Sequence, residues 1–150
     1  MILYLDTSAL VKLYVDEEVG GELVRQGVEE SESIAVSTVA YAEARAGLAR
    51  KQREGLFTAG ELRRTVAELD EDWRTYARLD VSDKLSRQAG ELAERYSLRG
   101  YDAVHLASAV QLSERFDVVR FLAFDDRLNE AARSAELPVY GERRRNEQDE

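Results

Sequence analysis

The sequence contains no cysteine and a single histidine, His105. The missing cysteines exclude a disulfide framework and thiolate metal sites. One histidine cannot complete the usual ligand set of a structural zinc site either. No segment approaches the roughly 18–20 consecutive apolar residues of a membrane-spanning helix. We therefore expect a cytoplasmic protein with no membrane association.

The chain has 150 residues, a length typical of one domain, and its 44% apolar and 34% charged residues fit a folded globular protein. The formal net charge of −9 argues against tight, non-specific binding of nucleic acid, because phosphates are held mainly by Lys and Arg. Basic residues nevertheless cluster in one stretch, at Arg45, Arg50, Lys51, Arg53, Arg63 and Arg64. A weak, transient grip on a polynucleotide is compatible with this composition.

Short β-like runs alternate with helical stretches, and this alternation favours an α/β fold with a parallel sheet. Strands are predicted at residues 2–5, 34–36, 79–81, 118–124 and 138–140. Helices are predicted at residues 10–14, 18–29, 39–53, 61–76, 83–96, 102–116 and 126–134. Residues 141–150 carry no large apolar side chain, so we expect a domain at residues 1–140 followed by a charged, disordered tail at 141–150.

Four acidic residues stand beside or inside apolar runs, where an ionised carboxylate is unfavourable unless a positive charge compensates it. They are Asp6, Glu43, Asp102 and Asp125. If these side chains converge on one cleft, they form a site for a hard cation such as Mg²⁺ or Mn²⁺, which prefers carboxylate and water oxygens. Such a site indicates phosphodiester chemistry.

Three of the four acids have an alternative role, because Asp6, Asp102 and Asp125 each precede a predicted helix and Asp is a favoured N-cap residue. The two roles are compatible, since a cap holds the carboxylate in a fixed place. Asp6 and Asp125 also follow strands, and open α/β sheets bind ligands at the carboxyl ends of their strands. Asp126 competes with Asp125 as the fourth acid, and Asp125 is preferred because it lies nearer the strand end.

Glu43 lies inside a predicted helix and cannot be a cap. A glutamate there usually faces solvent, but no Lys or Arg lies at the helical spacing that would pair with it, and small residues surround it. We expect it to point into a crevice. His105, one turn after Asp102, is interpreted as a hydrogen-bonded core residue, with a contact to the site or substrate as the alternative. Thr7 and Ser8 are interpreted as local caps whose hydroxyls also face the site.

The segments LDTSALVKLY, SxxxxAEARAGL, LRGYDAVHLASA and LAFDDRLNEAA occur in an order and at a spacing that resemble the PIN-domain family, in its VapC-type toxin branch. The resemblance extends over roughly residues 1–140. It implies a three-layer α/β/α fold with a parallel, five-stranded sheet flanked by helices. This implied fold agrees with the alternation of strands and helices in the sequence.

The resemblance also implies a site, an activity and partners. It places the family's acidic quartet on Asp6, Glu43, Asp102 and Asp125, with Thr7 and Ser8 at the polar position after the first aspartate. It implies a Mg²⁺- or Mn²⁺-dependent endoribonuclease with one or two ions, in which a metal-activated water hydrolyses RNA. As partners it implies a second copy of the chain, in a homodimer, and a cognate antitoxin protein that inhibits the enzyme.

Two other functions compete with this interpretation. A phosphohydrolase could use Asp6 as its nucleophile, but such enzymes usually need a second aspartate two residues later, where this chain has Ser8. The sequence also contains no phosphate loop of the GxxxxGK type. A catalytically inactive, protein-binding relative would keep the fold, but it has no reason to keep four unfavourable carboxylates.

Overall fold

Four parallel strands form the centre of residues 1–16 and 19–142, the part of the chain that the computed structural model describes. The strands are β1 (Ile2–Leu5), β2 (Ser33–Ser37), β3 (Ala77–Leu79) and β4 (Val119–Leu122). Their order is β3-β2-β1-β4, so β1 is central, with Tyr4 opposite Ala35 of β2 on one side and Phe121 of β4 on the other. The carboxyl ends of all four strands therefore lie at the same edge of the sheet.

The prediction of a fifth strand at residues 138–140 is wrong. This segment pairs with β4 through a single parallel bridge between Phe121 and Val139. The Phe121 N–H donates to the Pro138 carbonyl and the Tyr140 N–H donates to the Phe121 carbonyl, both at 2.8 Å. Pro138 has no N–H to extend the ladder, and the chain turns away at Gly141, whose φ is 86°. The pairing therefore stops after one bridge.

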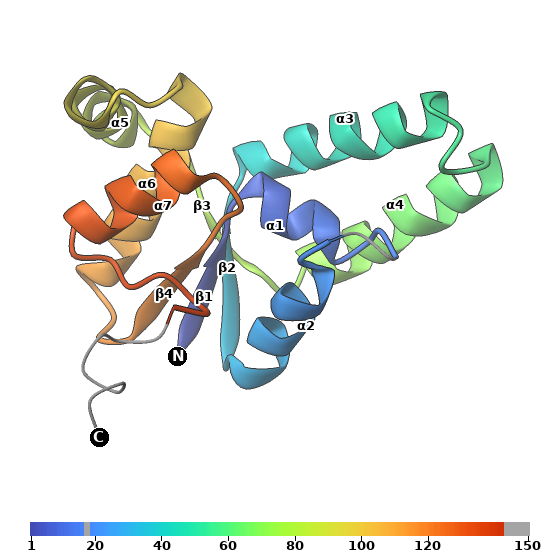
Figure 1. Ribbon diagram of the computed structural model, residues 1–150, viewed down its shortest axis with the longest axis horizontal. Coiled ribbons are helices and arrows are strands. Elements are labelled where there is room, and N and C mark those ends of the chain that lie inside the picture. The colour runs from blue at the N-terminus through green and yellow to red at the C-terminus, as the bar shows by residue number, and fades with distance from the viewer. Residues whose placement is uncertain (17–18, 143–150) are drawn as a thin grey trace.

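Helices cover both faces of the sheet, which confirms the predicted three-layer α/β/α arrangement (Figure 1). They are α1 (Thr7–Lys12), α2 (Gly21–Glu30), α3 (Val39–Arg53), α4 (Ala59–Trp73), α5 (Asp83–Tyr96), α6 (Gly100–Ser113) and α7 (Asp126–Ser134). Tyr4 packs in a hydrophobic cluster with residues of α5, α6 and α7. Leu3 and Leu5 pack in a second cluster with α1, α2, α3 and α4. This division follows from the strand, whose successive side chains face opposite sides.

Most predicted elements occur close to their expected bounds, and α3, α5 and α7 have the predicted bounds. The helix predicted at 61–76 begins two residues earlier, because Thr58 and Glu61 form a capping box with bonds of 3.1 and 3.2 Å. The strand predicted at 79–81 is β3, two residues earlier in the chain. Position 18 of the second predicted helix and positions 143–150 of the predicted tail lie outside the described residues.

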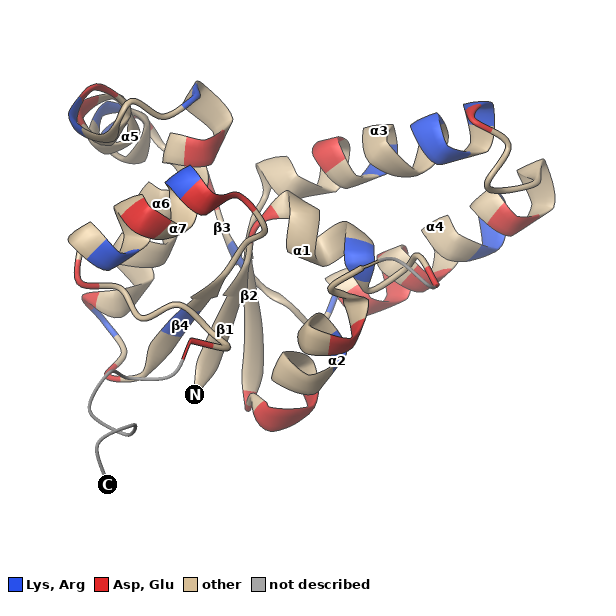
Figure 2. Ribbon diagram, in the orientation of Figure 1, with Lys and Arg blue, Asp and Glu red and all other residues tan. Residues whose placement is uncertain are grey.

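The helices α3 and α4 project together away from the sheet as a helical arm (Figure 1). The basic cluster seen in the sequence falls on this arm, and Figure 2 shows basic residues towards its far end. Acidic residues occupy the second half of α4 and both ends of α2 (Figure 2). Among the described residues, no helix combines the length and the apolar character needed to cross a membrane.

Candidate active site

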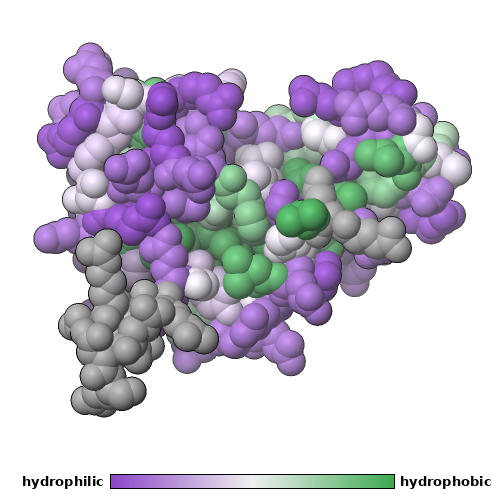
Figure 3. All heavy atoms as spheres, in the orientation of Figure 1, coloured by the Kyte–Doolittle hydropathy of each residue, from purple (hydrophilic) through white to green (hydrophobic). Residues whose placement is uncertain are grey.

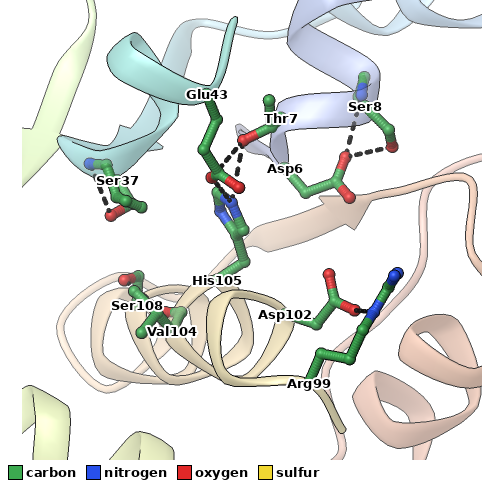
Figure 4. Close-up of polar contacts among 12 residues, drawn as sticks. Asp6, Thr7, Ser8, Ser37, Glu43, Arg99, Asp102, Val104, His105 and Ser108 are labelled. Carbon is green, nitrogen blue, oxygen red and sulfur yellow. Dashed lines mark hydrogen bonds and ion pairs between the residues drawn. The ribbon is translucent and has the colours of Figure 1, made fainter. Parts of the chain in front are cut away.

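A pocket of about 280 Å³ lies at the carboxyl ends of β1 and β4, where α1, α3 and α6 meet. It is lined by Asp6, Thr7, Ser8, Glu43, Arg99, Asp102, His105, Phe124 and Asp125. The fold thus brings all four predicted acids together from distant parts of the chain. Figure 4 shows Asp6, Glu43 and Asp102 on separate segments around one space.

Asp6 directly follows β1 and caps α1, and it is only 5% exposed. The Ala9 N–H donates to its Oδ1 at 2.9 Å, and the Ser8 hydroxyl donates to the same oxygen at 2.7 Å. Burial raises the pKa of Asp6 above its ordinary value, despite the opposing effects of His105 and of these two hydrogen bonds. The predicted cap is confirmed, and it holds a carboxylate that the surroundings disfavour in its charged form.

Glu43 projects from the first half of α3 into the pocket, as expected for a glutamate in a crevice. The Thr7 hydroxyl donates to its Oε1 at 2.7 Å, and His105 Nε2 lies 3.1 Å from the same oxygen. Partial burial raises the pKa of Glu43, but the contacts with His105 and Thr7 outweigh it and lower that pKa overall. Glu43 is therefore held as a carboxylate in one orientation.

His105 is 2% exposed and hydrogen-bonded at both ring nitrogens, so the prediction of a hydrogen-bonded core histidine is confirmed. Its Nδ1 lies 2.9 Å from the Tyr4 hydroxyl, and its Nε2 lies 3.1 Å from both Thr7 Oγ1 and Glu43 Oε1. Burial raises the pKa of Tyr4 well above its usual range, so this side chain stays a phenol. If that phenol donates to Nδ1, the Nε2–H is left to donate towards Glu43. Figure 4 shows the resulting contact between His105 and Glu43.

Asp102 lies in the first turn of α6, and the prediction that it caps this helix is wrong. The helix begins at Gly100, two residues earlier, so Arg99 occupies the N-cap position. The Arg99 Nε donates to Asp102 Oδ2 at 3.2 Å. This ion pair stands at the pocket rim, where the Arg99 side chain is 83% exposed. Solvent screening makes such a pair weak.

Asp125, and not Asp126, lines the pocket. Asp125 caps α7, and the Leu128 N–H donates to its Oδ1 at 2.8 Å. Asp126 begins the helix itself and its side chain is exposed to solvent. Because the chain runs from strand to cap to helix, the first aspartate of the pair lies nearer the strand end, as the sequence predicts for Asp125.

The four carboxylates share one feature that suits a hard cation. In each of them the protein hydrogen bonds found among the described residues fall on a single oxygen, which leaves the second oxygen available. Four such oxygens, with the hydroxyls of Thr7 and Ser8 nearby, fit the ligand preference of Mg²⁺ and Mn²⁺.

The four side chains share the pocket but stand apart. Within residues 1–16 and 19–142, no three acidic or histidine side chains converge closely enough to hold one ion as they stand. Like charges repel, and each carboxylate has its own protein partner. Binding of an ion here would require small side-chain movements. The exposed Arg99–Asp102 pair is weak and would oppose such a movement of Asp102 only slightly.

Three residues at or beside the pocket were not predicted from the sequence: Tyr4, Arg99 and Phe124. Arg99 had a local signal, since it precedes Asp102 by three residues, a spacing at which helical side chains meet. Phe124 directly precedes Asp125 and so shares its place at the strand end. Tyr4 had none, because its contact with His105 joins positions 101 residues apart.

The comparison with known proteins identifies the family. A family model described as "PIN domain" matches residues 3–134. The chain belongs to the PIN-domain family. It is 34% identical over 134 residues to Ribonuclease VapC45 of Mycobacterium tuberculosis, a match that covers 89% of this chain and 91% of the relative. The predicted membership of the family's VapC-type branch is thereby confirmed.

Solved structures of other PIN-domain proteins share the fold. VapC20 of Mycobacterium tuberculosis, described as a sarcin-ricin loop cleaving toxin, has a TM-score of 0.64 at 16% identity, covering 86% of this chain and 94% of its own. A toxin–antitoxin complex from Klebsiella pneumoniae contains a chain with a TM-score of 0.60 at 18% identity, covering 82% and 86%. These likenesses establish the PIN architecture of the molecule.

The burial of Asp6 predicts a pH-dependent effect on stability. The pKa of Asp6 is raised in the folded state. The ionised carboxylate therefore destabilises the fold at a pH above that raised pKa. This destabilisation disappears as the pH falls below the pKa of Asp6 in the unfolded chain. In EDTA, Asp6→Asn should therefore raise the free energy of unfolding at pH 7, and should raise it by less at pH 4. Urea unfolding at both pH values measures this. A lower stability of the variant at pH 7 would contradict the burial argument.

Proposed function

We propose that this protein is a metal-dependent endoribonuclease, the toxin of a toxin–antitoxin pair, that hydrolyses RNA phosphodiester bonds at the acidic pocket. The observation that carries this proposal is the set of four carboxylates that line one pocket, each with one oxygen available. The relative named Ribonuclease VapC45 supports RNA as the substrate class. Asp6 has no second aspartate at position 8, which disfavours an aspartyl-phosphate mechanism.

Asp6, Glu43 and Asp102 would hold a central Mg²⁺ or Mn²⁺ ion, and Asp125 would hold a second ion or orient the attacking water. A bound divalent ion of this kind offsets the charge that develops on the phosphate and makes water a stronger nucleophile. The chain's own part is to fix the ligands. The caps of α1 and α7 hold Asp6 and Asp125 at the strand ends.

Glu43 is oriented by a chain of hydrogen bonds from the core. Tyr4 contacts His105, and His105 and Thr7 both contact Glu43 Oε1. The second oxygen of Glu43 has no partner among the described residues, so the carboxylate keeps it available for an ion. His105 is therefore a positioning residue in this proposal: it acts through Glu43 and not on the substrate.

A cognate antitoxin is the proposed protein partner, and a homodimer is the proposed assembly. The structural likeness to a chain of a toxin–antitoxin complex supports the antitoxin. The acidic pocket suits a basic side chain of an inhibitor, because the carboxylates that would bind an ion would also attract a guanidinium or an ammonium group.

Cleavage of total RNA tests the activity. Wild-type protein should cut RNA with Mg²⁺ or Mn²⁺ and stop in EDTA, and Asp6→Asn should lose more than about 100-fold of that activity. Asp125→Asn should be similarly impaired, whereas its neighbour Asp126→Asn, outside the pocket, serves as the matched control and should stay near wild type. Full activity of Asp6→Asn, with a circular dichroism spectrum like that of wild type, would refute the site.

Manganese affinity tests the positioning of Glu43 without reference to turnover. His105→Leu should weaken Mn²⁺ binding about 10-fold or more, because it removes the Nε2 donor. His105→Gln restores a donor near the same place and should recover most of the affinity. Tyr4→Phe should weaken binding to a smaller degree, and Tyr140→Phe, which removes a phenol bonded to Glu30 far from the pocket, should have no effect.

Calorimetric titration of metal-free protein separates the possible results. Equal Mn²⁺ affinity in wild type and His105→Leu, with loss in Asp6→Asn, would mean that His105 serves only the core. An absence of Mn²⁺ binding in the wild type, together with an absence of RNA cleavage, would identify the chain as an inactive, protein-binding relative.

A further inference from the structure

Phe124 is an exposed aromatic residue on the wall of the acidic pocket. It is 37% exposed and belongs to neither hydrophobic cluster, so the core does not account for it. Its ring is nevertheless closely packed at one edge, because a Cβ at Gly20 would lie only 2.5 Å from ring carbon Cε1. Its backbone is also tied to the site: the Phe124 N–H donates to Ser8 Oγ at 3.3 Å, and Ser8 donates to Asp6 at 2.7 Å.

Lys12, the last residue of α1, places its ammonium over this ring. Its Nζ lies 4.6 Å from the centroid of Phe124. Lys12 forms no ion pair within residues 1–16 and 19–142, although the whole chain has 30 acidic and only 21 basic residues. An ammonium group that is half-buried, held by an aromatic ring and free of carboxylate partners can accept an anionic ligand.

The surroundings favour RNA as that ligand. An aromatic ring can stack on any base, and an ammonium group can bind a backbone phosphate. Together the two groups can therefore contact both the base and the phosphate of RNA. Because the net charge is −9, the overall electrostatic potential of the protein does not attract RNA, and an RNA strand must be held by a few individual basic side chains. Figure 3 shows hydrophobic side chains gathered at the middle of the face that it draws, between the α7 side and the helical arm.

We propose that Phe124 and Lys12 form a nucleotide subsite that holds single-stranded RNA beside the bond to be cut. The Lys12 ammonium contacts a backbone phosphate, and the exposed part of the Phe124 ring stacks on the adjacent base. This subsite rests on the proposed ribonuclease function, and it explains how an acidic protein keeps a polyanion next to a pocket of carboxylates.

Binding of RNA to an inactive variant tests the subsite. The probe is a 12-nucleotide, fluorescein-labelled single-stranded RNA of mixed sequence, titrated with Asp6→Asn protein in Mg²⁺ and followed by fluorescence anisotropy. Adding Lys12→Gln or Phe124→Leu should each weaken binding about 5- to 10-fold. Lys12→Gln should also reduce the slope of log affinity against log salt by about 0.7, whereas Phe124→Leu should leave that slope unchanged.

Matched substitutions elsewhere on the surface serve as controls. Lys84→Gln on α5 makes the same change of charge, and Phe116→Leu, at a residue 49% exposed, makes the same change of side chain; both should leave affinity within twofold of the parent. An oligonucleotide that carries abasic sugars should erase the effect of Phe124→Leu and keep that of Lys12→Gln. Thermal unfolding should show that all variants are folded.

The results distinguish failure of the subsite from failure of the function. If wild type cleaves RNA and the Asp6→Asn parent binds the probe, but Lys12→Gln and Phe124→Leu bind it as tightly as the parent, the subsite is refuted and the pair belongs to the fold or to a protein partner. If the parent does not bind the probe at all, the subsite is also refuted. If wild type cleaves no RNA with either metal, the proposed function itself fails.

Discussion

The hydrogen bonds that join Glu43, Thr7 and His105 are the contact on which the pocket depends. Glu43 and Thr7 belong to the helical layer formed by α1 and α3, and His105 belongs to α6 in the opposite layer. Tyr4 of the central strand completes the connection at 2.9 Å from His105. The two layers and the sheet therefore meet at one carboxylate. A change in the packing of either layer would shift Glu43, so the position of its carboxylate depends on the packing of the core.

The pocket combines groups that oppose the stability of the fold with groups that compensate them. Asp6 is buried with a raised pKa, and His105 is buried with both nitrogens engaged. Helix caps and hydroxyl donors offset part of the desolvation, since hydrogen bonds to a carboxylate favour its charged form. The remaining unfavourable charge is what a divalent cation would neutralise. Ligand binding and stability are then linked, because an ion that binds only the folded state stabilises it.

Local sequence patterns predicted the parallel α/β class, most helices and the four candidate acids, because strand ends, caps and small-residue helices have short-range signals, whereas the three-layer arrangement was implied by the family resemblance. Asp6 and Asp125 follow apolar runs, and Glu43 lacks any helical partner. Contacts between distant residues had no such signal, and Glu43 meets His105 across 62 positions. The prediction of a fifth strand was wrong because Pro138 and the turn at Gly141 limit the pairing of residues 138–140 with β4 to one bridge. The side-chain pairing in the pocket could be seen only in the folded molecule.

Anomalous diffraction from crystals grown with Mn²⁺ tests the central claim most directly, because it locates the ion without reference to activity. We expect one or two anomalous peaks in the pocket, within coordination distance of Asp6, Glu43 and Asp102, with Asp125 against the second peak or an ordered water. Loss of these peaks in crystals of Asp6→Asn would complete the result. Manganese bound elsewhere, or a wild-type pocket that stays free of manganese at millimolar concentration, would contradict the account.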